Sequence, residues 1–77
     1  MTDEQKVREA ISELLRREVP MTASTRLRED LALDSMNLVE LTVIVHSRYG
    51  VDLGRRAVER KLMPVTVADV AALLRAS

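Results

Sequence analysis

The sequence predicts an all-α fold, a four-helix bundle with a long first loop and a short third helix. Apolar residues recur at helical spacing in separate segments, and capping residues, glycine or proline mark the ends of these segments. The 77 residues include no cysteine and a single aromatic residue, Tyr49, so an aliphatic core must hold the helices together without disulfides. A chain of this length is near the lower limit for one hydrophobic core, and we expect residues 1–77 to form a single domain.

Composition excludes several classes of function. The 12 basic and 12 acidic residues balance, whereas nucleic-acid-binding domains usually carry a basic excess. No apolar run approaches the roughly 18 residues of a membrane span, and the polar start from Met1 to Lys6 lacks the apolar region of a secretion signal. We expect a cytoplasmic, monomeric protein that binds no nucleic acid and spans no membrane.

Independent catalysis and metal binding are not expected. The chain has no metal-ligand spacing, no nucleophile–base pair and no glycine-rich phosphate loop. His46 is the only histidine, and with no second catalytic group near it in the sequence we expect it at the surface.

The first helix is expected from Asp3 to Arg17, with Thr2 or Asp3 as its cap and Pro20 preventing any continuation. Its single apolar stripe consists of Val7, Ile11, Leu14 and Leu15. Arg16 and Arg17 would lie in the last turn, where the helix dipole favours cations.

A long loop is expected from Glu18 to Asp34, because this stretch has no clean period. Three leucines, Leu27, Leu31 and Leu33, would attach it to the core. Loops this long in a compact domain are usually functional, which directs attention to the end of the loop at Asp34 and Ser35.

The second helix is expected from Ser35 to Tyr49, with Gly50 as its C-terminal stop. It carries two apolar stripes. One consists of Leu38, Leu41, Ile44, Val45 and Tyr49, and the other of Met36, Val39 and Val43, with Glu40 among them. A helix in a small bundle needs only one buried stripe, so the second is either covered by another helix or presented to a partner.

Two further helices complete the bundle. A short third helix is expected from Arg55 to Lys61, and Pro64 then breaks the pattern. The last helix is expected from Thr66 to Arg75, with Thr66 as cap and Asp69 at the third position after it, which is a weak capping-box arrangement.

The segment from Thr25 to Leu41 resembles the signature of the acyl carrier proteins. In that family an Asp-Leu turn is followed by an Asp-Ser-Leu triplet that opens a helix containing Val-Glu-Leu. The matching residues here are Asp30, Leu31, Asp34, Ser35, Met36, Val39, Glu40 and Leu41. The resemblance extends over nearly the whole chain, including the Tyr-Gly-Val-Asp-Leu run at 49–53 and the Thr-Val start of the last helix.

The resemblance implies a carrier and not an enzyme. Ser35 would be the attachment site of a covalent 4'-phosphopantetheine arm derived from coenzyme A, and Asp34 would help the transferase recognise this serine. The thiol at the end of the arm would hold an acyl or aminoacyl group as a thioester. The expected position of Ser35 is suited to this role, because unpaired N–H groups and the helix dipole favour a phosphate at a helix N-terminus.

The resemblance also implies a set of protein partners. These are a phosphopantetheinyl transferase, an acyl- or aminoacyl-loading enzyme, and a ketosynthase, acyltransferase or other tailoring enzyme. The expected docking face consists of Met36, Val39, Glu40 and Val43, flanked by Leu53 and Arg56.

Departures from the family pattern bear on the pathway. From Ser35 to Met63 there are five basic residues and three acidic ones, whereas fatty-acid carriers are strongly acidic here and are steered to basic partners. We therefore expect docking surfaces that are less positive, and a dedicated carrier of specialised metabolism such as polyketide or antibiotic biosynthesis. The segment after the short third helix, with Pro64, also resembles that of the aminoacyl carriers, including the D-alanyl type.

A different class of function is also compatible with these residues. Asp34 and Ser35 are also the residue types of an ordinary helix cap. In that case Ser35 would stay unmodified, and the chain would be a non-covalent helical interaction module that binds a partner through the second stripe.

Overall fold

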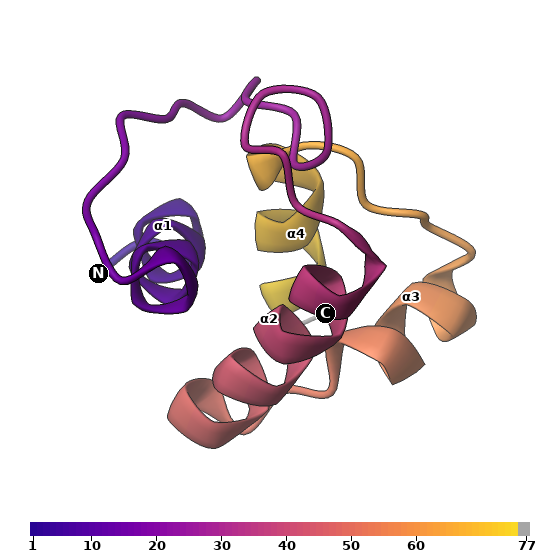
Figure 1. Cartoon of the computed structure of the whole chain (residues 1–77). Helices are drawn as coiled ribbons and strands as arrows, with labels where there is room; N and C mark the ends of the chain where they lie inside the picture. Colours follow the sequence, from indigo (N-terminus) through magenta and orange to yellow (C-terminus); the bar gives the residue numbers. More distant parts are fainter. Residues whose placement is uncertain (76–77) are drawn as a thin grey trace.

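The computed structural model describes residues 1–75. Within these residues there are four helices: α1 (Asp3–Leu15), α2 (Ser35–Tyr49), α3 (Leu53–Arg60) and α4 (Val67–Leu74). Helix α4 lies between α1 and α3, and α2 packs against α1 and α3 (Figure 1). The predicted all-α bundle with a long first connection and a short third helix is therefore confirmed.

The core is entirely aliphatic. Buried side chains come from all four helices and from the long connection; they are Val7, Ala10, Ile11, Leu27, Leu33, Leu41, Val45, Leu53, Val67, Val70, Ala71, Leu73 and Leu74. No polar or charged side chain among the described residues is buried. Burial of apolar area therefore stabilises the fold without any internal polar network.

The ends of the first helix differ in how well they were predicted. Thr2 is the N-cap and forms a complete capping box with Gln5. The helix ends at Leu15, two residues earlier than predicted, because Arg16 adopts a left-handed conformation with φ of 58°. The expectation that Arg16 and Arg17 lie in the last helical turn was wrong.

The short helices also differ from prediction at their ends. Helix α3 begins at Leu53, two residues before the expected Arg55, because the Asp52 side chain caps it by accepting the Arg55 N–H at 3.0 Å. Thr66 caps α4 as expected. The capping box with Asp69 is complete, and the Asp69 carboxylate also accepts the N–H of Val65 at 2.9 Å. The backbone N–H groups of Val65 and Thr66, which donate to the Asp69 carboxylate, lower the pKa of Asp69.

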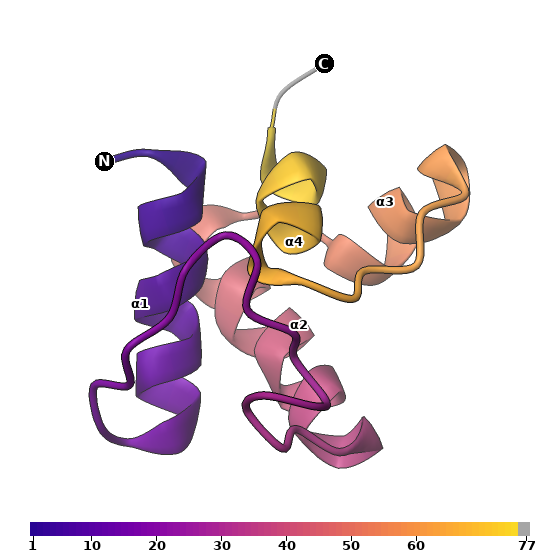
Figure 2. The ribbon, with the colours of Figure 1, turned by 90° about the horizontal axis from the view of Figure 1, so that it is seen from above.

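The long connection is held to the start of α4. It passes over α1 and reaches α4 before turning back to α2 (Figure 2). Hydrogen bonds join Leu27 N–H to Val65 O at 2.9 Å, and Arg26 and Thr66 form an antiparallel bridge. Leu27 and Leu33 are buried as predicted, whereas Leu31 is only partly buried against the core.

Polar contacts fix the C-terminal end of α2 on α1. The Arg48 guanidinium lies 3.2 Å from the Glu13 carboxylate and 3.6 Å from that of Glu9. The Tyr49 hydroxyl donates to the carbonyl oxygen of Lys6 at 3.4 Å. These contacts lie at the end of α2 opposite to Ser35 and hold that end against α1.

Two arginines of α3 bind the C-terminal end of α4. Arg56 Nη1 donates to the carbonyl oxygens of Leu73 and Leu74 at 2.9 and 3.2 Å. Arg60 donates to those of Ala72 and Arg75 at 2.6 and 2.9 Å. A helix end leaves its last carbonyls without intrahelical partners and carries partial negative charge, so cations placed there stabilise it.

We predict that Arg56→Ala lowers the free energy of unfolding by about 1–3 kcal/mol, because it leaves partly buried carbonyls without their charged donor. Urea unfolding followed by circular dichroism measures this change. The neighbouring Arg55→Ala is the matched control, since Arg55 makes only an exposed ion pair with Glu59, and its effect should stay within about 0.5 kcal/mol. Equal losses in the two variants would contradict the capping role.

Candidate functional site

Ser35 is the first residue of α2, and Asp34 is the N-cap that precedes it. The Asp34 carboxylate accepts the N–H of Asn37 at 2.8 Å, and the Asn37 side-chain oxygen accepts the N–H of Asp34 at 3.1 Å. This reciprocal pair forms a complete capping box. Capping is thus carried by Asp34, and the Ser35 hydroxyl is not used for it.

The surroundings of Ser35 are suited to an anion. The residue is exposed, and within residues 1–75 neither its own N–H nor that of Met36 has an acceptor. Unpaired N–H groups and the positive end of the helix dipole favour negative charge at this position. A phosphate joined to Ser35 Oγ would therefore lie in a favourable field.

Arg28 also contributes to the site, and the sequence analysis did not identify it. Its Nη2 atom donates to Ser35 Oγ at 3.1 Å from a position seven residues earlier in the chain. The signal that could have found it is a cation in the loop directly before the candidate serine, but only the fold of the loop determines which cation reaches the hydroxyl.

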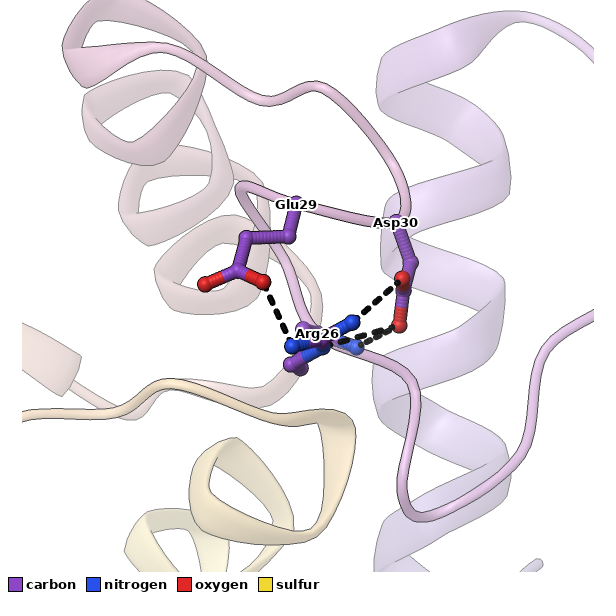
Figure 3. Close-up of polar contacts among 3 residues, drawn as sticks. All are labelled: Arg26, Glu29 and Asp30. Atoms are coloured by element: carbon purple, nitrogen blue, oxygen red, sulfur yellow. Dashed lines mark hydrogen bonds and ion pairs between the residues drawn. The ribbon is translucent and has the colours of Figure 1, made fainter.

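Two acidic residues of the same loop are paired with a second arginine. Arg26 lies between Glu29 and Asp30 and forms ion pairs with both, as shown in Figure 3. The backbone N–H of Arg26 also donates to the Asp30 carboxylate at 2.8 Å. This hydrogen bond, followed by the side-chain contacts of Arg26, lowers the pKa of Asp30 and keeps the carboxylate ionised.

The turn that leads into Ser35 contains a strained residue. Ala32 adopts a φ of 57°, in the left-handed region that a residue with a Cβ rarely occupies. Immediately after it, the N–H of Leu33 donates to the carbonyl oxygen of Leu27 at 3.0 Å and closes the loop. The left-handed turn at Ala32 thus lets the chain bury Leu33 and then expose Asp34 and Ser35.

The second apolar stripe of α2 faces solvent. Met36, Val39 and Val43 are 72%, 62% and 61% exposed, and Glu40 beside them is exposed as well. The other stripe is buried at Leu41 and Val45 and partly buried at its remaining members. Of the two arrangements considered for this helix, the described chain has the one in which the second stripe is left uncovered.

Two residues expected to flank this stripe have other positions. Leu53 is only 5% exposed, because as the first residue of α3 it packs into the core. Arg56 is directed to the C-terminal carbonyls of α4. Leu53 therefore does not add to the exposed surface, and Arg56 remains only partly exposed beside the stripe; a role of either residue in partner docking stays a prediction. His46 is exposed, as expected.

A comparison with protein-family models identifies the family. The model described as "Phosphopantetheine attachment site" matches residues 5–74. The chain belongs to this family. The comparisons with curated proteins and with solved structures gave no match. The predicted relation to the acyl carrier proteins is confirmed by the family match, which also gives the chain a carrier role with a covalent 4'-phosphopantetheine group.

The residues present around Ser35 fit such a group. The hydroxyl is exposed and free of capping, two backbone N–H groups next to it have no acceptor among the described residues, and the Arg28 guanidinium lies at hydrogen-bond distance. All of these features favour the negative charge of a phosphodiester. Beyond this site, no cluster of metal-ligating side chains and no helix able to cross a membrane occurs in the described part of this carrier.

We predict that Ala32→Gly raises the free energy of unfolding by roughly 0.5–1 kcal/mol. Glycine avoids the left-handed penalty of about 1–2 kcal/mol, and its larger backbone entropy in the unfolded chain offsets part of that gain. The midpoint of urea unfolding measures the change. Ala23→Gly is a matched control in the same loop, because Ala23 does not have a positive φ, and it should lower the midpoint. A lower midpoint for Ala32→Gly would contradict the strain at this turn.

Proposed function

We propose that this protein carries acyl or aminoacyl intermediates as thioesters on a phosphopantetheine arm attached to Ser35, and passes them between biosynthetic enzymes. The observation that carries the proposal is the hydroxyl of Ser35, which is exposed at the start of α2 and released from capping by Asp34. The family match across residues 5–74 supports it.

The chain would serve as the acceptor in the attachment step. Ser35 Oγ forms a bond to the phosphorus that carries the pantetheine group, the pyrophosphate bond of coenzyme A breaks, and adenosine bisphosphate leaves. The proton of the hydroxyl passes to a base of the transferase or to solvent. Exposure of Ser35 lets the oxygen approach the donor, and the unpaired N–H groups stabilise the charge that remains on the product.

The thiol of the attached arm supplies the thioester chemistry. Within this proposal the carrier itself breaks no bond, and it acts in the cytoplasm, where coenzyme A and the transferase are available. Asp34 contributes by capping α2 and by presenting a carboxylate next to the modified serine, which fits a role in recognition by the transferase.

Partners would dock on the exposed stripe formed by Met36, Val39, Glu40 and Val43. This stripe begins at the residue after Ser35, so an enzyme that covers it also reaches the arm. A patch of exposed apolar side chains with a single charge is typical of a protein-binding surface. The partners would be the transferase, a loading enzyme, and a ketosynthase or acyltransferase.

The arginines of this half of the chain favour specialised metabolism over a fatty-acid role. The stripe holds one acidic residue, Glu40, and therefore cannot steer the carrier to strongly basic partners as an acidic helix would. A dedicated polyketide or antibiotic pathway fits this charge, and an aminoacyl carrier of the D-alanyl type is the alternative within the carriers.

We predict that incubation with coenzyme A, Mg²⁺ and a promiscuous phosphopantetheinyl transferase adds the mass of one phosphopantetheine group to the protein. Ser35→Ala should gain nothing. Intact-mass spectrometry measures both.

Ser24→Ala is the matched control, because Ser24 is an exposed loop serine with no such helix start, and it should be modified like the parent. An unmodified parent that circular dichroism shows to be folded would reject the carrier and favour the non-covalent interaction module. Modification of Ser35→Ala would place the arm on another residue.

We also predict that Val39→Glu lowers the kcat/KM of the transferase for this carrier by roughly tenfold, since a charge in the middle of a docking patch must be desolvated. Discontinuous mass analysis of initial rates provides the measurement. Val58→Glu is the control, because Val58 is 79% exposed on α3 and outside the stripe. Equal slowing by both substitutions would argue against the stripe as the docking face.

A further inference from the structure

Among residues 1–75, the side chain of Arg28 has one hydrogen-bond partner. Its Nη2 atom donates to Ser35 Oγ at 3.1 Å, and within residues 1–75 it takes part in no ion pair. A hydroxyl is a neutral and weak acceptor for a guanidinium, which binds best to two oxygens of an anion. The contact therefore leaves most of the binding capacity of Arg28 unused.

The nearby acidic residues have other partners. Glu29 and Asp30, which follow Arg28 directly, form ion pairs with Arg26 (Figure 3). The Asp34 carboxylate accepts the N–H of Asn37 in the capping box. Arg28 thus places a guanidinium at the hydroxyl of Ser35 without an ion-pair partner among residues 1–75.

The loop holds Arg28 in this position. Leu27, immediately before it, is buried and donates its N–H to Val65 O, and its carbonyl accepts the N–H of Leu33 at 3.0 Å. Leu33 is also buried. Because the backbone is held on both sides of the turn, this preorganisation reduces the entropy cost of ordering Arg28 when an anion binds.

We infer that Arg28 is a positioning residue, which binds the phosphodiester of the phosphopantetheine arm once the arm is attached to Ser35. This inference rests on the proposed function. Attachment converts the Ser35 oxygen into one member of a phosphodiester and brings two charged, non-bridging oxygens next to it. The guanidinium can then exchange a neutral acceptor for the anionic oxygens of the phosphodiester, which adds the attraction of an ion pair and allows two parallel hydrogen bonds.

This contact would change what a partner enzyme encounters at the base of the arm. The phosphodiester carries one negative charge, and Arg28 would neutralise it locally. A partner that approaches along α2 would therefore meet an ion pair at Ser35, and a basic group aimed at the phosphate would have to compete with Arg28.

The test is phosphorus-31 NMR of the modified protein in a sodium chloride titration. We compare the parent with Arg28→Gln, which removes the charge, and with Arg28→Lys, which keeps the charge without the planar fork. At low salt the phosphorus resonance of Arg28→Gln should be displaced from that of the parent, with Arg28→Lys between them. Added salt screens an exposed ion pair, so the parent resonance should move toward that of Arg28→Gln.

Arg17→Gln is the matched control. Arg17 lies far from Ser35, because it lines a surface groove together with Arg48. Arg48 follows Ser35 by 13 residues in α2, which is about 20 Å along the helix. The phosphorus resonance of Arg17→Gln should coincide with that of the parent, although this variant loses the same charge as Arg28→Gln. Circular dichroism of each variant checks the fold.

The outcomes separate this inference from the proposed function. Intact mass is measured first, and a parent that accepts no arm would overturn both. A modified parent whose phosphorus resonance coincides with that of Arg28→Gln at every salt concentration would overturn the role of Arg28 alone. The same holds if Arg17→Gln displaces the resonance as much as Arg28→Gln does.

Discussion

Three backbone hydrogen bonds tie the long connection to the start of α4: Leu27 N–H to Val65 O, Val67 N–H to Thr25 O, and Ala68 N–H to Ala23 O, at 2.9–3.0 Å. They fix a segment that has no regular structure of its own. Because Leu27 and Leu33 are then buried on either side of the turn, the chain can leave the core only at Asp34. The position of Ser35, and of every group around it, depends on this attachment.

The charged residues of the α2–α3 half take part largely in internal contacts. Counted along the sequence, they suggest a basic surface. In the fold, Arg48 pairs with Glu9 and Glu13, and Arg56 and Arg60 bind the carbonyls that end α4. Their charge remains, but their hydrogen-bonding groups are occupied, so the surface offered to a partner is governed more by the apolar stripe than the count of arginines indicates.

Local patterns allowed much of this architecture to be predicted. The bounds of α2 follow from Asp34 before it and Gly50 after it, and the burial of Val67, Val70, Leu73 and Leu74 follows from their spacing. The exposure of one stripe of α2 could not be predicted in this way. Periodicity distinguishes two faces, but only the packing of the other helices determines which face they cover.

The features that the sequence did not predict share a physical cause. They depend on contacts between residues distant in the sequence or on the conformation of a turn. Arg28 reaches Ser35 across a turn in which Ala32 adopts a left-handed conformation, and a non-glycine residue gives no sign of such a conformation in the sequence. Arg56 reads as a surface cation because its acceptors are backbone carbonyls, which have no signature in the sequence. The burial of Leu53 was not predicted, because the sequence analysis started the third helix at Arg55 and did not use the cap at Asp52, which makes Leu53 the first residue of α3.

The residues of α2 that hold the helix in the bundle are separate from those that are exposed. The buried stripe of α2, and the contacts of Arg48 and Tyr49 with α1, hold the helix in place, while the exposed Met36, Val39, Glu40 and Val43 lie outside the core. Substitutions in this second group should therefore leave the free energy of unfolding nearly unchanged. The outer face of α2 can thus vary in sequence while the bundle beneath it stays the same.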